Sequence, residues 1–247
     1  MASPLVHYRV EDRIASVVLD SQPNRNALSR RLVAELHDGL ERAAEDDDVL
    51  AVVVRAEGRT FCSGADLSEA HGEGMAEAAG VLVELQRRIV TLPKPVVARV
   101  HGAVRAGGIG IVAAADIAIA TEDASFALTE VRLGLAPAAI SLTVLPRLTD
   151  RAAALSVLTG DVFSGRDAER MGLVTRAVPA ADLDEAVARV CTSLVAGSPQ
   201  GLRESKALLT RHVVERIDAQ GAELAALSGR LFASEEARAA MLAFLSR

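Results

Sequence analysis

Residues 100–120 of the chain, which decide its fold, read VHGAVRAGGIGIVAAADIAIA. An apolar strand predicted over 95–100 enters this segment, and an apolar helix over 108–115 and a second strand over 116–120 complete it. A strand that turns directly into a helix leaves several peptide N–H groups without acceptors at the start of the helix. The helix dipole adds positive potential at the same point. We therefore expect the intervening turn, which contains Gly102, Gly107, Gly108 and Gly110, to hold either a phosphate or a developing oxyanion.

The composition is that of a folded protein with an aliphatic core. Of the 247 residues, 50% are hydrophobic, 24% are charged and 2% are aromatic, and tryptophan is absent. A chain of this length can bury a substantial core, which here must be built from Ala, Val, Leu and Ile. The formal net charge of −6 argues against a nucleic-acid partner, because binding to phosphates needs a basic surface.

Cysteine usage and hydropathy indicate the compartment. Cys62 and Cys191 are far apart and lack the spacing of a metal site, which fits a reducing environment without a bound metal. The first residues contain no apolar signal core, and no apolar run reaches the length of a membrane span. We expect a soluble, cytoplasmic protein with no membrane association.

The first half of the chain alternates strands, turns and helices, as expected for an α/β protein. The predicted elements are a hairpin of strands over 5–10 and 14–20, a helix begun by Ser29, an apolar strand over 49–55, a glycine-bearing turn over 58–67, a mobile segment over 68–80 and a helix over 81–92.

After a short strand over 125–128, the rest of the chain is predicted to be almost entirely helical. The predicted helices cover 138–145, 151–159 with Asp150 as its cap, Ser164 to Gly172 with Asp167 in the cap, Asp182 to Ala196 with Glu185 in the cap, 199–212, 217–230 and 234–246. The apolar stripes of the last helices indicate either core packing or a subunit interface.

The glycine turn at 106–110 does not match the phosphate-binding motifs. A dinucleotide site needs G-x-G-x-x-G near the start of a βαβ unit, and a P-loop needs Gly-Lys-Ser/Thr, and neither is present. A simple tight turn, in which glycine provides positive φ or close packing, is the alternative. A second turn over 63–67 offers another peptide N–H, at Ala65. Two such donors facing one oxygen would form an oxyanion hole.

The two turns, in this order, resemble those of the crotonase (enoyl-CoA hydratase/isomerase) superfamily, and the similarity covers almost the whole chain. The matching positions are Pro23, 26–28, 61–67, 93–98, 101–102, 107–108, 116–117, Phe126, Glu130, Gly134, Pro137, 158–160 and 168–174. This resemblance implies an α/β spiral of β-β-α units over 1–190 and a C-terminal helical trimerisation region over 191–247. It also implies a homotrimer or a homohexamer built as a dimer of trimers.

The resemblance also implies the site residues. The peptide N–H groups of Ala65 and Gly107 would hold the thioester oxygen of an acyl-CoA substrate. The segments 25–28 and 65–67 would line the channel for coenzyme A, with contacts from Arg25, Ala27, Leu28, Ala65, Asp66 and Leu67. Because coenzyme A is part of the substrate, no separate cofactor is expected.

A carboxylate must move the proton beside the thioester. Family hydratases use two glutamates, of which the second corresponds to Glu130 and the first to Gly110, which has no side chain. A glutamate near a strand end is usually exposed. Glu130 follows the apolar residues 126–128, however, so we expect partial burial to raise its pKa. Glu130 is the predicted acid/base.

Other polar residues near the turns are weaker candidates. Asp66 is expected to serve as a turn or cap residue, His101 to pack beside the turn, and Asp116 to be structural. His71 falls in the variable segment, and Cys62 has no evident partner base.

Three functions fit these residues. The first is a hydratase that adds water to a 2-enoyl-CoA with Glu130 as the single acid/base, on a substrate that could be branched or carboxylated. The second is an enoyl-CoA isomerase, which needs only one carboxylate. The third is a catalytically weak acyl-CoA-binding protein. Arg105 or Arg132 could pair with Glu130 or with a carboxylate of the substrate.

Overall fold

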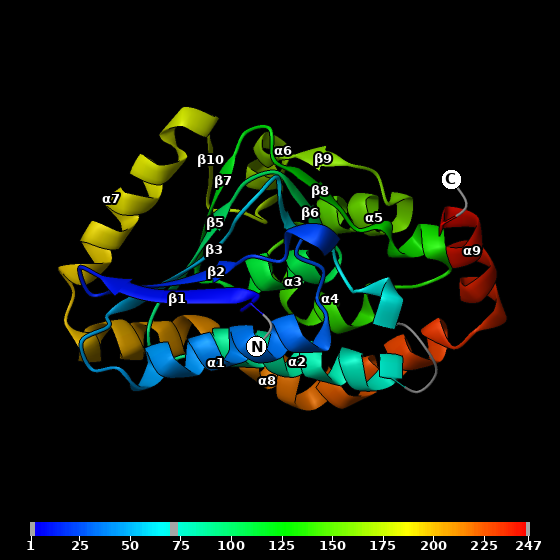
Figure 1. The fold of residues 1–247 in the computed structure, drawn as a ribbon, viewed down its shortest axis with the longest axis horizontal. Helices are drawn as coiled ribbons and strands as arrows, with labels where there is room; N and C mark the ends of the chain where they lie inside the picture. The colour runs from blue at the N-terminus through cyan, green and yellow to red at the C-terminus, as the bar shows by residue number, and fades with distance from the viewer. Residues whose placement is uncertain (1–2, 70–73, 246–247) are drawn as a thin grey trace.

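The computed structural model describes residues 3–69 and 74–245. These residues form two sheets with helices around them (Figure 1). The strands are β1 (Val6–Glu11), β2 (Ile14–Leu19), β3 (Ala51–Ala56), β4 (Thr60–Cys62), β5 (Val96–Val100), β6 (Ala103–Arg105), β7 (Ile117–Thr121), β8 (Ser125–Ala127), β9 (Phe163–Ser164) and β10 (Arg176–Val178).

Helices are interspersed among the strands as far as β10. The α-helices are α1 (Arg30–Glu45), α2 (Gly74–Thr91), α3 (Gly107–Ala114), α4 (Ala138–Val144), α5 (Asp150–Thr159), α6 (Gly165–Met171), α7 (Leu183–Val195), α8 (Pro199–Phe232) and α9 (Glu235–Leu245). Short 3-10 helices are η1 (Gln22–Asn24), η2 (Leu67–Glu69), η3 (Thr129–Leu133) and η4 (Ala180–Asp182).

The larger sheet has six strands in the order β1-β2-β3-β5-β7-β10, and all neighbours except β1 and β2 are parallel. Both faces of its central strands are covered, because successive side chains point to opposite faces. On β3, Val52 and Val54 belong to the main core, on the face of the sheet that α1 and α2 cover, whereas Val53 packs toward α7 on the other face (Figure 1).

The second sheet explains how the chain spirals. Its order is β4-β6-β8-β9. From β3 to α3, each pair of consecutive strands places the first strand in the larger sheet and the second in the smaller one, and a helix then returns the chain. This is the expected spiral of β-β-α units. The sequence did not reveal β4, β6, β9 or β10, because strands of two or three residues carry too little periodicity.

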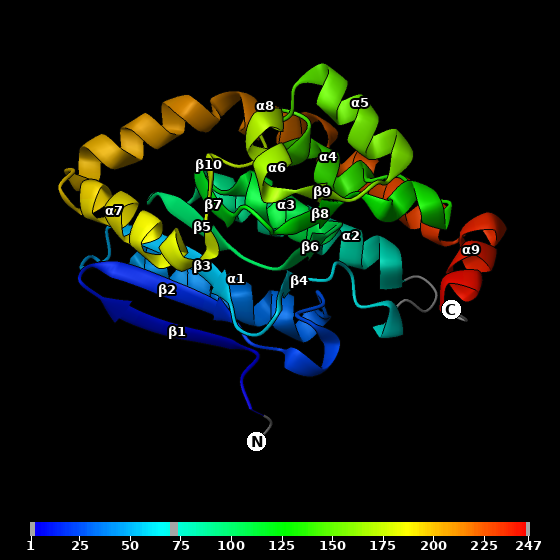
Figure 2. The same ribbon diagram turned by 90° about the horizontal axis from the view of Figure 1, so that it is seen from above.

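The C-terminal helices differ from the prediction in two respects. The helices expected over 199–212 and 217–230 are one helix, α8, because the stretch between them contains no glycine or proline. Its buried positions continue through that stretch, from Lys206 and Thr210 to Val213 and Ile217. The boundary expected after residue 190 falls inside α7, and α8 packs along α2 of the same chain (Figure 2).

A buried ion pair ties α8 to the spiral. The ammonium group of Lys206 lies 2.7 Å from the carboxylate of Asp116 and donates to the carbonyls of Ile89 and Lys94. Asp116 also accepts the peptide N–H of Val96 at 2.7 Å. The structural role expected for Asp116 is therefore confirmed.

Several local predictions can be compared with the structure. The caps at Ser29 and at Ser164 with Asp167 are confirmed, since both serine hydroxyls accept the expected peptide N–H. The cap at Asp150 is wrong, because Thr149 occupies the N-cap of α5. Asp182 stands at the N-cap of α7, as expected, but its side chain makes no cap hydrogen bond.

The segment expected to be mobile over 68–80 is helical from Gly74 onward, because the alanine-rich residues there extend α2. Residues 70–73 lie outside the described part. Across 3–69 and 74–245, the helices lack the combination of length and apolarity that crossing a bilayer requires.

Candidate active site

The turn after β4 leaves one peptide N–H free. The N–H of Leu28 donates to the carbonyl of Gly64 at 2.8 Å, and the N–H of Asp66 faces the carbonyl of Leu28 at 3.5 Å. Because a bridging strand residue directs its own groups to the opposite side, the N–H of Ala65 points away from Leu28. Within the described chain, this N–H has no acceptor.

The turn after β6 leaves a second free N–H at the start of α3. Ala106 has φ of 43° and ψ of −116°, an uncommon conformation for a residue with a side chain, and it occupies the N-cap of α3 without a side-chain hydrogen bond. Among the described residues, no acceptor is bonded to the N–H of Gly107, the first residue of α3. Strain at such a point is typical of functional sites.

Glycine in this turn serves close packing rather than positive φ. A side-chain carbon placed on Gly107 would lie 2.6 Å from Leu28, and one on Gly108 would lie 2.7 Å from Cβ of Cys62. The latter contact brings the start of α3 against β4. The two turns therefore touch each other, and a carbon on Gly64 would lie 3.1 Å from Cβ of Ala106.

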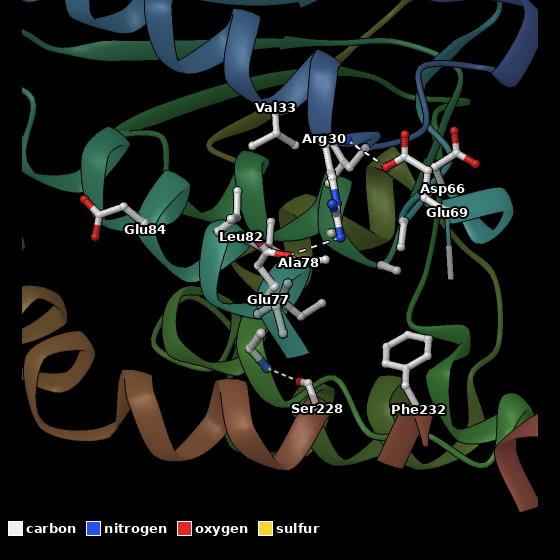
Figure 3. Close-up of a pocket in the computed structure, with 18 of the residues that line it drawn as sticks. Arg30, Val33, Asp66, Glu69, Glu77, Ala78, Leu82, Glu84, Ser228 and Phe232 are labelled. Atoms are coloured by element: carbon white, nitrogen blue, oxygen red, sulfur yellow. Dashed lines mark hydrogen bonds and ion pairs between the residues drawn. The ribbon is translucent and has the colours of Figure 1, made fainter. Parts of the chain in front are cut away.

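Both free N–H groups belong to residues that line one cavity of about 510 Å³. Its apolar lining includes Leu28, Val33 and Leu82, and the last two are labelled in Figure 3. Its mouth is polar. The guanidinium of Arg30 lies 3.2 Å from the carboxylate of Glu77, and the peptide N–H of Arg30 donates to Glu69 at 2.9 Å.

Glu130 lines the same cavity and is 9% exposed. It lies in the first turn of η3, directly after β8. Its Oε2 atom is buried without a hydrogen-bond partner in the described residues. Burial raises the pKa of this carboxyl from 4.5 to about 7, although the peptide N–H of Glu130 itself opposes the shift. The predicted rise in pKa is confirmed, and a group with this pKa can both accept and return a proton near neutral pH.

Gly110 stands where the resemblance places the first glutamate of family hydratases, and it is packed too tightly for a side chain. A carbon placed there would lie 2.7 Å from Ile140 and 3.2 Å from Oε1 of Gln86. Gln86 is fully buried, accepts the hydroxyl of Thr143 at 2.6 Å and donates to the carbonyl of Ala139 at 3.2 Å. Sequence reasoning missed Gln86, although a glutamine on the apolar face of the helix predicted over 81–92 was a signal.

The residues expected along the coenzyme A channel divide into two groups. Leu28, Ala65 and Asp66 line the cavity. Arg25 is exposed and Ala27 is buried, and neither belongs to the cavity wall. Leu67 begins η2 next to Asp66.

Asp66 acts as the expected turn residue. Its carboxylate accepts the hydroxyl and the peptide N–H of Ser68 and the side-chain amide of Asn24. These bonds hold the pKa of Asp66 below its usual value.

Sequence reasoning also missed the role of Asn26. Its buried side chain accepts the N–H of Ser21 at 2.7 Å and donates to the carbonyls of Glu57 and Thr60. The signal was an asparagine in a turn, where this residue type often bonds to backbone. These bonds hold the segment that carries Leu28 against β4.

Neither predicted arginine contacts Glu130. Arg105 donates to the carbonyl of Ser125 at 2.5 Å and to its hydroxyl at 3.0 Å. Arg132 pairs with Asp161 at 2.5 Å. The pairing expected between one of them and Glu130 is wrong, because both guanidinium groups already bond to other acceptors outside the cavity.

The remaining candidates are structural or lie elsewhere. His101 lies beside the turn, and its Nε2 is 2.8 Å from the carbonyl of Gly58. Cys62 is fully buried, which raises the pKa of its thiol to about 12 and makes it a poor nucleophile. His71 lies outside the described residues.

Two unpaired peptide N–H groups and one buried carboxylate in a single cavity can stabilise an oxyanion and move a proton beside it. This arrangement defines a class of enzymes that work through an enolate or a related oxyanion. The sequence profile of the enoyl-CoA hydratase/isomerase family matches residues 9–247. The chain therefore belongs to this family, the crotonase superfamily.

Individual relatives agree with this assignment. The chain is 33% identical over 242 residues to the "Probable enoyl-CoA hydratase" of Bacillus subtilis, covering 96% of this chain and 94% of that protein. It is 32% identical over 211 residues to the hydroxycinnamoyl-CoA hydratase-lyase of Pseudomonas fluorescens, covering 81% and 76%. The crystal structure of an enoyl-CoA hydratase from Mycobacterium avium is 48% identical, with a TM-score of 0.93 over 99% of this chain and 97% of that one.

Proposed function

We propose that this crotonase-type enzyme adds water to a 2-enoyl-CoA thioester. One observation carries the proposal, namely that the unpartnered carboxylate oxygen of Glu130 lies in the same cavity as the free N–H groups of Ala65 and Gly107. The thioester oxygen would accept both N–H groups. The coenzyme A part of the bound substrate would extend out of the cavity past Leu28 and Asp66. The reaction would need no other cofactor.

The proposed reaction uses Glu130 twice. Its carboxylate removes a proton from water while the water oxygen forms a bond to C3 of the enoyl group. The electron pair of the double bond moves toward the thioester, and the N–H groups of Ala65 and Gly107 stabilise the resulting enolate oxygen. The proton held by Glu130 then passes to C2, and the thioester carbonyl forms again.

An enoyl-CoA isomerase is the second candidate, and the packing at Gly110 favours it. Ile140 and Gln86 occupy the space beside this glycine, so the described cavity wall contains no carboxylate at that point. Moving a proton between two carbons needs only one acid/base group, which Glu130 supplies. The same two peptide N–H groups would stabilise the dienolate.

A substrate with a neutral acyl chain is favoured over a carboxylated one. Arg105 and Arg132 bond to other groups, and neither lines the cavity. Among the described residues that line the cavity, Arg30 and His37 are the basic ones, and Arg30 is already paired with Glu77. The acyl end of the substrate would thus contact mainly aliphatic side chains.

The test is an assay with crotonyl-CoA and a 3-enoyl-CoA. Hydration removes the ultraviolet absorbance of the conjugated thioester, whereas isomerisation of the 3-enoyl compound creates it. Turnover of crotonyl-CoA that is lost in Glu130→Gln supports the hydratase, and turnover of the 3-enoyl-CoA alone supports the isomerase. Measurable binding of acyl-CoA with neither reaction would indicate a catalytically weak acyl-CoA-binding protein.

We also propose a homotrimer or a dimer of trimers in the cytoplasm. The support is membership of the enoyl-CoA hydratase/isomerase family. Light scattering coupled to size-exclusion chromatography of the full chain would determine the number of subunits.

A further inference from the structure

The end of α8 forms one wall of the cavity, and this wall has no role in the chemistry proposed above. Ser228 and Phe232 line the cavity from α8 (Figure 3). The hydroxyl of Ser228 is occupied, because it accepts the peptide N–H of Ala139 at 3.3 Å. Phe232 is the last residue of α8, and its ring projects from the helix into the cavity in Figure 3.

Glu130 and Phe232 line the same cavity. After Glu130, the same segment continues through Ala136, Pro137 and Ala138, all of which line the cavity. These residues present no side-chain hydrogen-bonding group, so the wall that they form is apolar. Asp66 lies on the far side of the cavity from Phe232 (Figure 3).

Two anchors hold Phe232 in place. On its N-terminal side, α8 lies against α2 so closely that a side-chain carbon on Gly221 would be 3.1 Å from Val83. On its C-terminal side, the hydroxyl of Ser234 donates to the carbonyl of Leu231 at 2.7 Å and accepts the N–H of Ala237 at 3.1 Å. The turn between α8 and α9 is therefore fixed by local hydrogen bonds.

The second anchor reaches the segment that carries Glu130. Ala237 of α9 is fully buried, and its peptide nitrogen would lie 3.2 Å from a side-chain carbon on Gly134, the residue that ends η3. The turn that follows Phe232 is thus packed, through α9, against the segment that carries Glu130. These contacts fix the backbone that carries Phe232.

We infer that Phe232 limits the length of the acyl chain that the cavity accepts, an inference that rests on the proposed function. With coenzyme A on the side of Asp66 and the reacting carbons beside Glu130, an alkyl chain extends along residues 136–138 toward the Phe232 ring. A longer chain meets the ring, whose backbone position the two anchors fix. Each methylene that an apolar pocket gains or loses typically changes discrimination by tenfold or more.

The experiment compares kcat/KM for 2-decenoyl-CoA and crotonyl-CoA. In Phe232→Ala, the ratio of the first to the second is expected to rise by about tenfold or more, because the truncated side chain frees space at the end of the alkyl path. In Phe232→Trp, which fills more of that space, the ratio is expected to fall. Leu231→Ala is the matched control, since Leu231 precedes Phe232 in the same helix without lining the cavity, and its ratio should equal that of the unmodified protein.

A binding measurement separates this inference from the proposed reaction. Calorimetric titration with butyryl-CoA and decanoyl-CoA reports the same ratio without turnover. A shift of the affinity ratio in Phe232→Ala supports the inference even if no enoyl-CoA is converted. An unchanged ratio in both Phe232 variants, with binding intact, would overturn the inference while leaving the hydratase in place. Absence of binding to every acyl-CoA would overturn both.

Discussion

Gly64 and Ala106 lie in contact although they belong to turns 42 residues apart, and a methyl group on Gly64 would lie 3.1 Å from Cβ of Ala106. Each of the two residues directly precedes one of the free N–H groups. Gly64 has φ of +95°, a backbone conformation that favours glycine, and a side-chain carbon at this position would crowd Ala106. The relative position of the two N–H groups therefore depends on the absence of a side chain at residue 64.

The first prediction concerns this contact. Gly64→Ala should separate the two turns and lower kcat by about 100-fold, which is the usual cost of losing one oxyanion donor. Steady-state kinetics with crotonyl-CoA would measure the loss. Gly80→Ala is the control, because Gly80 lies in α2 with open space around it and should leave kcat unchanged. Equal kcat values for the two variants would argue against a shared oxyanion site.

The second prediction concerns the proton. Glu130 must be ionised in the free enzyme to accept a proton from water, so kcat/KM should rise with pH and level off above an apparent pKa near 7. Glu130→Gln should reduce kcat by about 100-fold to 10,000-fold and leave the Kd for a saturated acyl-CoA nearly unchanged. A pH profile whose midpoint lies near 4.5 would show that the reacting carboxyl is not a buried one.

The third prediction concerns how the buried carboxyl of Glu130 makes the stability of the protein depend on pH. The pKa of Glu130 is higher in the folded protein than in the unfolded chain, so its contribution to stability is fully present below pH 4.5 and is lost as the pH rises through about 7. The loss amounts to roughly 3 kcal/mol of unfolding free energy. Glu130→Gln, which stays neutral, should match the unmodified protein at pH 4.5 and exceed its stability by that order at pH 8. Urea unfolding of both proteins at pH 4.5 and pH 8 would measure their unfolding free energies. If the two proteins differed by the same amount at both pH values, the prediction would be contradicted.

The α/β spiral and the pairing of Ala65 with Gly107 came from the resemblance to a known family. The free N–H of Ala65 follows from the turn after a strand, which is local information. The raised pKa of Glu130 also follows locally, because apolar neighbours in sequence predict burial. The second sheet did not follow as a whole, since β4 and β6 become strands only by pairing with each other and with β8, whose residues the sequence did predict to be a strand. In the same way, nothing local shows that Ile140 and Gln86 fill the space at Gly110.

The fourth prediction tests that space. Gly110→Glu should destabilise the protein by about 1–3 kcal/mol or more, because the new side chain meets Ile140 at 2.7 Å. Gly110→Glu combined with Ile140→Ala should recover part of this loss, since the smaller residue removes the closest contact. Unfolding free energies of both single variants and of the double variant form a cycle that isolates the interaction. Additive effects of the two substitutions would show that Ile140 does not define the space beside Gly110.

The last prediction concerns the attachment of α8, on which the Phe232 wall depends. Lys206 is 5% exposed, and its removal would leave the carboxylate of Asp116 and the carbonyls of Ile89 and Lys94 without their shared donor. Breaking a buried pair in this way typically costs about 3–5 kcal/mol. Lys206→Ala should therefore lower the unfolding free energy by that amount. Lys206→Met together with Asp116→Asn should cost less, because no buried charge is left unpaired. Arg189→Ala is the control, since its exposed pair with Glu185 in α7 should contribute less than about 1 kcal/mol. If Lys206→Ala proved as stable as Arg189→Ala, the ion pair could not be what holds α8 against the spiral, and the helix packing alone would have to position Phe232.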